Sequence, residues 1–156
     1  MLTIDIPGWK PLALRHLFLD YNGTLAMDGK LLPGVSERLT ELSAQLDIHV
    51  LTADTFGSVR KELSAVPCDL LIIPLQNQAQ AKADRLCSFD PALSAAVGNG
   101  RNDALMLREA ALGIALLQEE GAAPQTLAAA DVVCRSIPDA LDLLLHPLRL
   151  TATLRG

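Results

Sequence analysis

Short apolar runs alternate with amphipathic stretches along almost the whole chain. The runs are brief and are followed by polar or turn-forming residues, which is typical of buried strands. Between them, apolar positions recur at helical spacing; Val35, Leu39, Leu42 and Leu46 form one such stripe. The pattern predicts strands at 2–6, 14–20, 47–52, 70–73, 93–97, 112–116 and 131–133, and helices at 33–46, 78–86, 103–110 and 137–145, with shorter helices within 119–130 and 147–156.

The alternation of strands and helices predicts an α/β fold with a mainly parallel sheet and helices on both of its faces. The stretch 2–6 alternates apolar and polar residues, so we expect an edge strand or one arm of a hairpin. Thr55 or Ser58 is expected to cap a helix that runs to about residue 65. Right-handed crossovers place the loops after the parallel strands at one edge of the sheet. The length of 156 residues predicts one domain, 1–156.

Composition narrows the range of functions. Half of the residues are apolar and only 3% are aromatic, so the core is expected to be mainly aliphatic. The net charge is -5 and no basic run occurs, which argues against a nucleic-acid partner. No apolar run approaches the roughly 18 residues of a membrane span, and no signal-peptide pattern is present. We therefore expect a cytoplasmic protein without a membrane partner. Cys68, Cys87 and Cys134 are scattered, so a zinc site is not expected.

Asp20 ends one of the apolar runs, and the turn-forming pair Asn22-Gly23 follows it. A buried strand that delivers a carboxylate to a loop is a common way to present a catalytic group, because ligands of open α/β sheets gather beyond the carboxyl ends of the strands. Taken alone, the stretch is explained equally well by a strand, a turn and a solvated Asp20. His16, in the same strand, has no partner motif and is expected to be structural.

Three further motifs follow in order: Thr52 at a strand end, Lys82 in a helix, and residues 98–103, Gly-Asn-Gly-Arg-Asn-Asp. Together with the Asp20 motif they resemble the haloacid dehalogenase (HAD) superfamily of phosphoryl-transfer hydrolases. The set looks most similar to the phosphorylation domain of P-type ATPases and to soluble P-type ATPase-like proteins, over about residues 14–145. The resemblance implies a Rossmann-like HAD fold, a phosphorylated substrate and Mg²⁺ as cofactor. It does not imply ion transport, since no membrane segment is present.

The resemblance also implies a role for each motif residue. Asp20 is the nucleophile that forms an aspartyl-phosphate, Thr52 offers its hydroxyl to the phosphoryl group, and Lys82 keeps Asp20 ionised and offsets negative charge. The catalytic set is Asp20, Asn22, Thr52 and Lys82; the substrate-binding set is Gly23, Ala53 and Asn102; the metal-binding set is Asp20, the Asn22 backbone carbonyl, Asn99 and Asp103. Oxygen ligands of this kind suit Mg²⁺.

Two positions depart from the family pattern. Asn22 stands where most HAD phosphatases have a second Asp as general acid and base, a contribution worth roughly 10²–10⁴-fold. P-type ATPases also lack an acid here, and their aspartyl-phosphate is long-lived. We therefore expect either slow hydrolysis or an accumulating phospho-intermediate. Asn99 stands where the family has an Asp that binds the metal, so the affinity for metal is expected to be lower.

The chain leaves no room for a cap domain, because only residues 26–32 separate the Asp20 motif from the next expected helix. The pair Asp28-Gly29 predicts a hairpin turn in this stretch, and the resemblance places Met27 and Lys30 near the substrate. An open site suits either a macromolecular substrate or a small one enclosed by a neighbouring subunit of a homo-oligomer.

The expected activity is that of a Mg²⁺-dependent phosphatase or ATPase-like hydrolase. A rival hypothesis is a HAD-fold binding or regulatory protein, whose catalysis Asn22 and Asn99 have weakened. A third hypothesis is a phosphoprotein in which phosphate on Asp20 acts as a signal. The joint presence of Asp20, Thr52, Lys82 and Asp103 favours the enzyme, although fold alone does not prove function.

Overall fold

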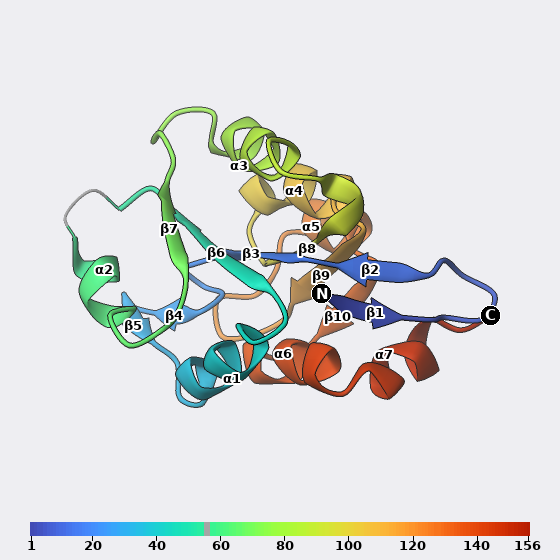
Figure 1. Ribbon diagram of the computed structural model, residues 1–156. Helices are drawn as coiled ribbons and strands as arrows, with labels where there is room; N and C mark the ends of the chain where they lie inside the picture. Colours follow the sequence, from blue (N-terminus) through green and yellow to red (C-terminus); the bar gives the residue numbers. More distant parts are fainter. Residues whose placement is uncertain (55–56) are drawn as a thin grey trace.

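A six-stranded sheet forms the centre of the molecule (Figure 1). The computed structural model describes residues 1–54 and 57–156. All neighbouring strands of the sheet run parallel, in the order β10-β9-β8-β3-β6-β7. The strands are β3 (His16–Asp20), β6 (Asp47–Thr52), β7 (Asp69–Ile72), β8 (Ser94–Gly98), β9 (Leu112–Leu116) and β10 (Val132–Cys134). The predicted α/β fold with a mainly parallel sheet is confirmed.

Helices cover both faces of this sheet, as the sequence predicts (Figure 1). One face carries α1 (Val35–Leu42), α6 (Ile137–Leu145) and α7 (Pro147–Leu154); the other carries α3 (Gln78–Cys87), α4 (Ala104–Glu109) and α5 (Pro124–Ala129). The side chains of β3 alternate between two cores, because Leu17 and Leu19 pack on one face and Phe18 on the other. A strand buried on both faces needs apolar residues at every position, which explains the unbroken apolar runs.

The N-terminal stretch forms a hairpin outside the main sheet. β1 (Leu2–Ile4) pairs antiparallel with β2 (Leu12–Leu14), so the hairpin alternative is the correct one. The prediction of one strand over 14–20 is wrong, because the chain changes partners at Arg15. The Arg15 N–H donates to the Leu93 carbonyl (2.7 Å), and the Arg15 carbonyl accepts from Asp47 N–H (2.8 Å).

A second hairpin follows Asp20, as predicted for the stretch around Asp28-Gly29. β4 (Ala26–Met27) pairs antiparallel with β5 (Lys30–Leu31). Asp28 and Gly29 both have positive φ (50° and 78°), which the tight two-residue turn requires. The Tyr21 hydroxyl donates to the Gly29 carbonyl (3.0 Å) and ties the hairpin to the loop after β3. In the described residues no cap domain accompanies this hairpin.

Two helices differ in extent from the apolar pattern. α1 ends at Leu42, although Leu46 still packs in the core as part of the following turn. The helix expected to run to about residue 65 ends at Glu62. The short helix expected within 119–130 is present as Pro124–Ala129, after Gly121 with its left-handed backbone (φ 72°). The short elements α2 (Ser58–Glu62), η1 (Pro91–Leu93) and η2 (Arg101–Asp103) complete the chain. Among the helices within residues 1–54 and 57–156, none is long and apolar enough to cross a membrane.

Of the two caps predicted for α2 (Ser58–Glu62), Ser58 is wrong and Thr55 is not tested. Ser58 is the first helical residue and not the cap, and Thr55 lies outside the described residues. The Asp54 carboxylate accepts hydrogen bonds from the Ser58 hydroxyl (2.6 Å) and from Val59 N–H (3.2 Å). An acid reaching into the first turn satisfies a free N–H of the helix, so Asp54 takes the stabilising role.

Candidate active site

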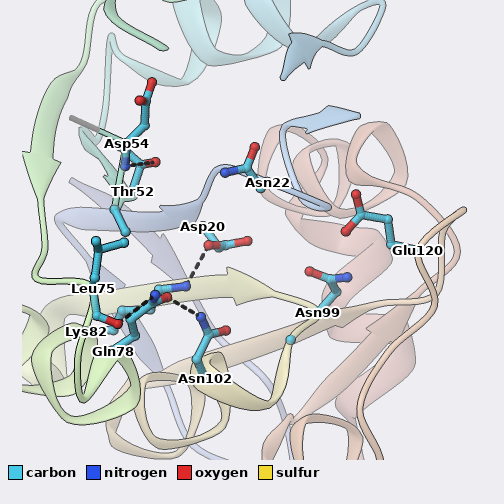
Figure 2. A pocket seen from close by; sticks show the side chains of 12 residues that line it. Asp20, Asn22, Thr52, Asp54, Leu75, Gln78, Lys82, Asn99, Asn102 and Glu120 are labelled. Carbon is cyan, nitrogen blue, oxygen red and sulfur yellow. Dashed lines mark hydrogen bonds and ion pairs between the residues drawn. The ribbon is translucent and has the colours of Figure 1, made fainter. Parts of the chain in front are cut away.

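The carboxyl ends of β3, β6 and β8 meet at one edge of the sheet, where a cavity of about 460 Å³ opens (Figure 2). Ligands of open α/β sheets bind at this kind of edge, because the loops after neighbouring parallel strands converge there. The lining residues are Asp20, Asn22, Thr52, Ala53, Asp54, Leu75, Gln78, Lys82, Asn99, Gly100, Asn102 and Glu120. Seven of the predicted site residues are therefore brought together around one cavity, namely Asp20, Asn22, Thr52, Ala53, Lys82, Asn99 and Asn102.

Lys82 forms the electrostatic centre of this site. Its side chain is only 1% exposed, and its Nζ donates to Asp20 Oδ1 and to Asp103 Oδ1, both at 2.6 Å. Burial opposes the charged form of Lys82, but the two carboxylates outweigh it, and the pKa of Lys82 is raised. A buried ammonium between two carboxylates is thus held protonated, and it fixes the position of both acids.

Asp20 reaches the cavity from the end of β3 with each oxygen in a different contact. Oδ1 accepts from Lys82, and Oδ2 accepts from the Thr24 hydroxyl at 3.1 Å. Burial, and next the Asp103 carboxylate, raise the pKa of Asp20 to about 7, while Lys82 and Thr24 act in the opposite direction. Two carboxylates face a single ammonium, so a divalent cation in the cavity would favour the ionised form of Asp20.

Asp103 lies behind Lys82 and does not line the cavity. It is fully buried, and its Oδ2 accepts from the backbone N–H groups of Asn99 (3.0 Å) and Gly100 (2.9 Å). Gly98 makes this arrangement feasible, since a Cβ at residue 98 would collide with the Asp103 carboxyl group. Both oxygens of Asp103 therefore accept hydrogen bonds from protein groups, and its buried carboxylate fixes the conformation of the 98–103 loop.

Asn99 faces the cavity from the end of β8. Its Nδ2 donates to the Gly121 carbonyl (2.9 Å), which turns Oδ1 toward the Thr24 hydroxyl (3.4 Å) and the Asp20 side of the site. Asn22 is exposed at the rim, two residues after Asp20 in the sequence. Both side chains that depart from the family pattern thus lie at the cavity: Asn99 is on the same side as Glu120, and Asn22 is above Asp20 (Figure 2).

The opposite wall is built from β6 and α3 (Figure 2). The Thr52 side chain is buried, and its Oγ1 accepts from Asp54 N–H at 3.1 Å. Asn102 donates from Nδ2 to Gln78 Oε1 at 2.8 Å, which joins the start of α3 to the 98–103 loop. This wall presents hydroxyl and amide groups, the donors that a phosphoryl group accepts hydrogen bonds from.

Gly23, predicted to bind substrate, is not among the lining residues. It has φ 79°, a conformation that favours glycine, and it lies beneath Asn99 and Glu120. Sequence reasoning missed four polar side chains of the site: Thr24, Asp54, Gln78 and Glu120. A signal existed for two of them, because Thr24 belongs to the Asp20 motif itself and Glu120 follows another parallel strand, β9.

The donors at the cavity fit a hard divalent cation such as Mg²⁺. Asp20 Oδ2 and the Asn99 amide oxygen both lie around the Thr24 hydroxyl, and Asn22 lines the same cavity; carboxylate, amide and backbone carbonyl oxygens are ligands that suit such a cation. Within the described part of the chain, no group of three or more His, Cys, Asp or Glu side chains is arranged to hold a metal. A cation here would therefore depend on neutral oxygens and water as well as on carboxylates.

The fold is similar to those of solved HAD phosphatases. A 3-deoxy-D-manno-octulosonate 8-phosphate phosphatase from Moraxella catarrhalis, solved with magnesium, phosphate and KDO, is 15% identical; the match covers 92% of this chain and 94% of that one, with a TM-score of 0.71. The cobalt-bound deoxy-D-mannose-octulosonate 8-phosphate phosphatase (YrbI) from Haemophilus influenzae is 13% identical; the match covers 92% of this chain and 94% of that one, with a TM-score of 0.72. A HAD-superfamily hydrolase structure from Legionella pneumophila gives 16% identity, 90% and 88% coverage and a TM-score of 0.71. The protein therefore has the fold of the HAD phosphatases.

Sequence comparison leads to two proteins of Methanocaldococcus jannaschii. The chain is 54% identical to the uncharacterized protein MJ0072 over 39 residues, which are 25% of this chain and 89% of that protein. It is 52% identical to the uncharacterized protein MJ0073 over 60 residues, 38% of this chain, and it spans only 64% of the length of MJ0073. No family model matches the chain. The chain belongs to the family of MJ0072.

Proposed function

We propose that the protein is a Mg²⁺-dependent phosphoryl-transfer hydrolase, a phosphatase or ATPase-like enzyme that works through an aspartyl-phosphate on Asp20. The observation that carries this proposal is the placement of Asp20: a carboxylate at a polar cavity, held by Lys82 Nζ at 2.6 Å and by the Thr24 hydroxyl at 3.1 Å. Phosphoryl transfer requires a nucleophile, charge compensation and positioning, and this site offers all three.

In the first step an oxygen of Asp20 attacks phosphorus, and the bond from phosphorus to the leaving-group oxygen breaks. Water then attacks the phosphorus of the aspartyl-phosphate, which releases inorganic phosphate and restores the Asp20 carboxylate. Lys82 compensates negative charge throughout, while Thr52 and Asn102 donate hydrogen bonds to phosphoryl oxygens, with the backbone N–H of Ala53 beside them.

Mg²⁺ would be held by Asp20, by the Asn22 backbone carbonyl and by the Asn99 amide oxygen, and it would supply positive charge to the phosphoryl oxygens. Asp103 contributes from behind, because its oxygens are already engaged with Lys82 and with the backbone of residues 99 and 100. It therefore orients the metal-binding loop in this proposal and does not contact the metal directly.

Asn22 makes the reaction slow. An amide neither donates a proton to the leaving group nor takes one from the attacking water, and general acid–base help is worth roughly 10²–10⁴-fold. Turnover should therefore be low for alcohol leaving groups and higher for acyl phosphates such as acetyl phosphate, whose leaving group needs no proton. The rival hypothesis of a binding or regulatory protein rests on the same two amides, Asn22 and Asn99.

The test is hydrolysis of p-nitrophenyl phosphate and acetyl phosphate with and without Mg²⁺, in the wild type and in Asp20→Asn. We expect Mg²⁺-dependent turnover that falls by at least about 10³-fold in the variant, because the nucleophile is lost. Asp84→Asn is the matched control, since Asp84 is exposed on the same helix as Lys82 and does not line the cavity. Absence of both turnover and phosphoprotein by intact mass in the wild type would favour the binding or regulatory protein.

A further inference from the structure

The loop 117–123 after β9 folds against the Asp20 loop and is fixed there by Gln118. Gln118 Nε2 donates to the backbone carbonyls of Gly23 and Thr24, both at 2.8 Å. Its Oε1 accepts from Ile137 N–H at 2.9 Å, the first residue of α6. The Gln118 side chain thus connects the loop 117–123 with Gly23 and Thr24 and with the start of α6. The loop has a defined position relative to Asp20.

The same loop is bound a second time, on the other side of Glu120. The Asn99 amide Nδ2 donates to the Gly121 carbonyl, and Ala123 N–H donates to the Asn99 carbonyl, both at 2.9 Å. Glu120 therefore sits between two anchors that belong to the Asp20 and Asn99 motifs. Its backbone is held at the cavity although its side chain is exposed.

The carboxylate of Glu120 lies at the cavity beside Asn99 (Figure 2). The surroundings of Gly23 show how near the Glu120 and Asn99 side chains are to each other. A Cβ added to Gly23 would lie 2.9 Å from Asn99 Nδ2 and 3.0 Å from Asn99 Oδ1, and closer still to Glu120 Oε2. One point above Gly23 is therefore within reach of both side chains. In residues 1–54 and 57–156, no donor or cation within the protein pairs with the Glu120 carboxylate.

The Glu120 carboxylate lies in a part of the site that has little negative charge. Asn99 is neutral, and Asp20 and Asp103 share the ammonium of Lys82, so these three charged groups leave a single surplus negative charge when both acids are ionised. Glu120 adds a negative charge on the Asn99 side of the cavity, whereas Asp54, which also lines the cavity, accepts hydrogen bonds from Ser58 and Val59. A divalent cation that retains several waters is bound mainly through a few carboxylates, so one additional acid changes its affinity strongly.

We infer that Glu120 is an acidic ligand of the divalent cation, bound directly or through one of its waters, and that it supplies the negative charge that Asn99 lacks. The inference rests on the proposed function, because it assigns a residue to the same metal. It also explains how a chain with an amide at position 99 retains a cation site. The missing negative charge comes from the loop after the next parallel strand, 21 positions after Asn99.

The experiment is calorimetric titration of the wild type and of Glu120→Gln with Mg²⁺, at about 0.15 M salt to screen distant surface charge. Loss of a group that supports a metal site typically costs about 10–100-fold in affinity, and we expect the Kd for Mg²⁺ to rise by about tenfold or more. Glu119→Gln is the matched control, because Glu119 is the adjacent exposed acid but does not line the cavity. Its Kd should stay within about twofold of the wild type.

A second pair of variants tests the charge argument. Asn99→Asp places a carboxylate at the position of the amide, so Glu120→Gln should cost only a few-fold in the Asn99→Asp background. Equal losses in Glu119→Gln and Glu120→Gln, or an unchanged Kd in Glu120→Gln, would overturn the inference. A wild type that shows no Mg²⁺ binding would overturn it as well.

The two proposals fail separately. Suppose that Mg²⁺ binds, that Glu120→Gln weakens this binding and that Asp20 is never phosphorylated. The inference about Glu120 then stands, and the proposed hydrolase activity does not. If Asp20 is phosphorylated while Glu120→Gln binds Mg²⁺ like the wild type, the hydrolase stands and Glu120 has no role at the metal.

Discussion

The strands β3 and β6 carry polar side chains near both of their ends, and the two ends are built differently. At the carboxyl ends, Asp20 and Thr52 open onto the cavity. At the amino ends, His16 and His49 are packed together, with His16 Nδ1 and His49 Nε2 3.2 Å apart. The imidazole of His49 is 2% exposed, which is close to the 1% of Lys82. Burial alone does not distinguish the two regions.

The partners of the buried groups do distinguish them. Lys82 Nζ is paired with one oxygen of Asp20 and one of Asp103 at 2.6 Å, and the second oxygen of each acid accepts a hydrogen bond from a hydroxyl or from backbone N–H groups. By contrast, His49 Nδ1 has no hydrogen-bond partner in the described residues, since the nearest carboxylate oxygen, Asp69 Oδ2, is 3.6 Å away. The His49 ring stacks on Phe18 (4.6 Å between centroids, 23° between planes) and contacts Phe89 at 4.6 Å. Burial lowers the pKa of both histidines, so they pack as neutral rings.

The comparison shows how one pair of strands supports two kinds of interior. Charges are buried at the carboxyl ends, where they are paired, and imidazole rings pack against Phe18 and Phe89 at the amino ends. The expectation that His16 is structural agrees with this packing, although its partner His49 was not foreseen. Perturbing one end should therefore affect stability and chemistry together, and perturbing the other should affect stability alone.

The largest effect is expected from Lys82→Met. The substitution keeps the volume but leaves two buried carboxylates without a cation, which typically costs about 3–5 kcal/mol of unfolding free energy. Urea denaturation measures this value. Lys61→Met, at an exposed lysine on α2, should change stability by no more than about 0.5 kcal/mol.

Adding Asp103→Asn to Lys82→Met should restore part of the lost stability, because one of the two uncompensated charges is removed. A denaturation midpoint in Lys82→Met equal to that of the wild type would mean that the buried cation does not hold the site together.

A smaller effect is expected from His49→Phe. The phenyl ring preserves the stack on Phe18 and removes the unpartnered Nδ1, but it also removes the hydrogen bond with His16. These contributions oppose each other, so the unfolding free energy should change by about 1 kcal/mol or less. Phosphoryl transfer should be unchanged, because His49 does not line the cavity.

His49→Ala is the control for packing at this position, because it opens a cavity and should cost about 2–5 kcal/mol. If His49→Phe were as destabilising as His49→Ala, the imidazole itself would be required, and the amino end would not be mere packing.

The smallest effect concerns pH. Both histidines have a pKa below the ordinary 6.5 because they are buried. Between the folded and the unfolded pKa the unfolded chain binds more protons, so stability is complete above about pH 6.5 and declines as the pH falls through this window. The unfolding free energy of the wild type should therefore fall more between about pH 7.5 and pH 5 than that of His49→Phe.

The difference between the two proteins isolates the imidazole of His49, together with its interaction with His16. Asp20 contributes in the opposite sense, because its raised pKa makes the folded state bind a proton first, but this contribution is common to both proteins and cancels. The groups that act on the pKa of His16 are Asp47, Arg15 and Asp90. Those that act on the pKa of His49 are His16, which lowers it, and Asp69 and Asp47, which raise it. Parallel pH profiles in the two proteins would show that these carboxylates offset the burial.

The sequence alone determined the order and type of most elements. β9 and α6 begin and end at the predicted residues, because an apolar run and a helical stripe are local patterns. The parallel sheet followed from the alternation of elements, and the convergence of Asp20, Thr52, Lys82 and Asn99 followed from the sheet. The details that local patterns do not encode were missed, such as the change of partners at Arg15.

Only the tertiary structure decided which side chains meet. Lys82 and Asp20 are 62 positions apart. The order of the motifs pointed to Lys82, but its local sequence alone is that of a solvated helix lysine, and only the fold buries it between two acids. The anchors of Glu120 lie in three other segments, so its place beside Asn99 is equally invisible in the sequence. Periodicity reports which side of an element is buried, whereas partners depend on contacts between distant segments that form only when the chain has folded.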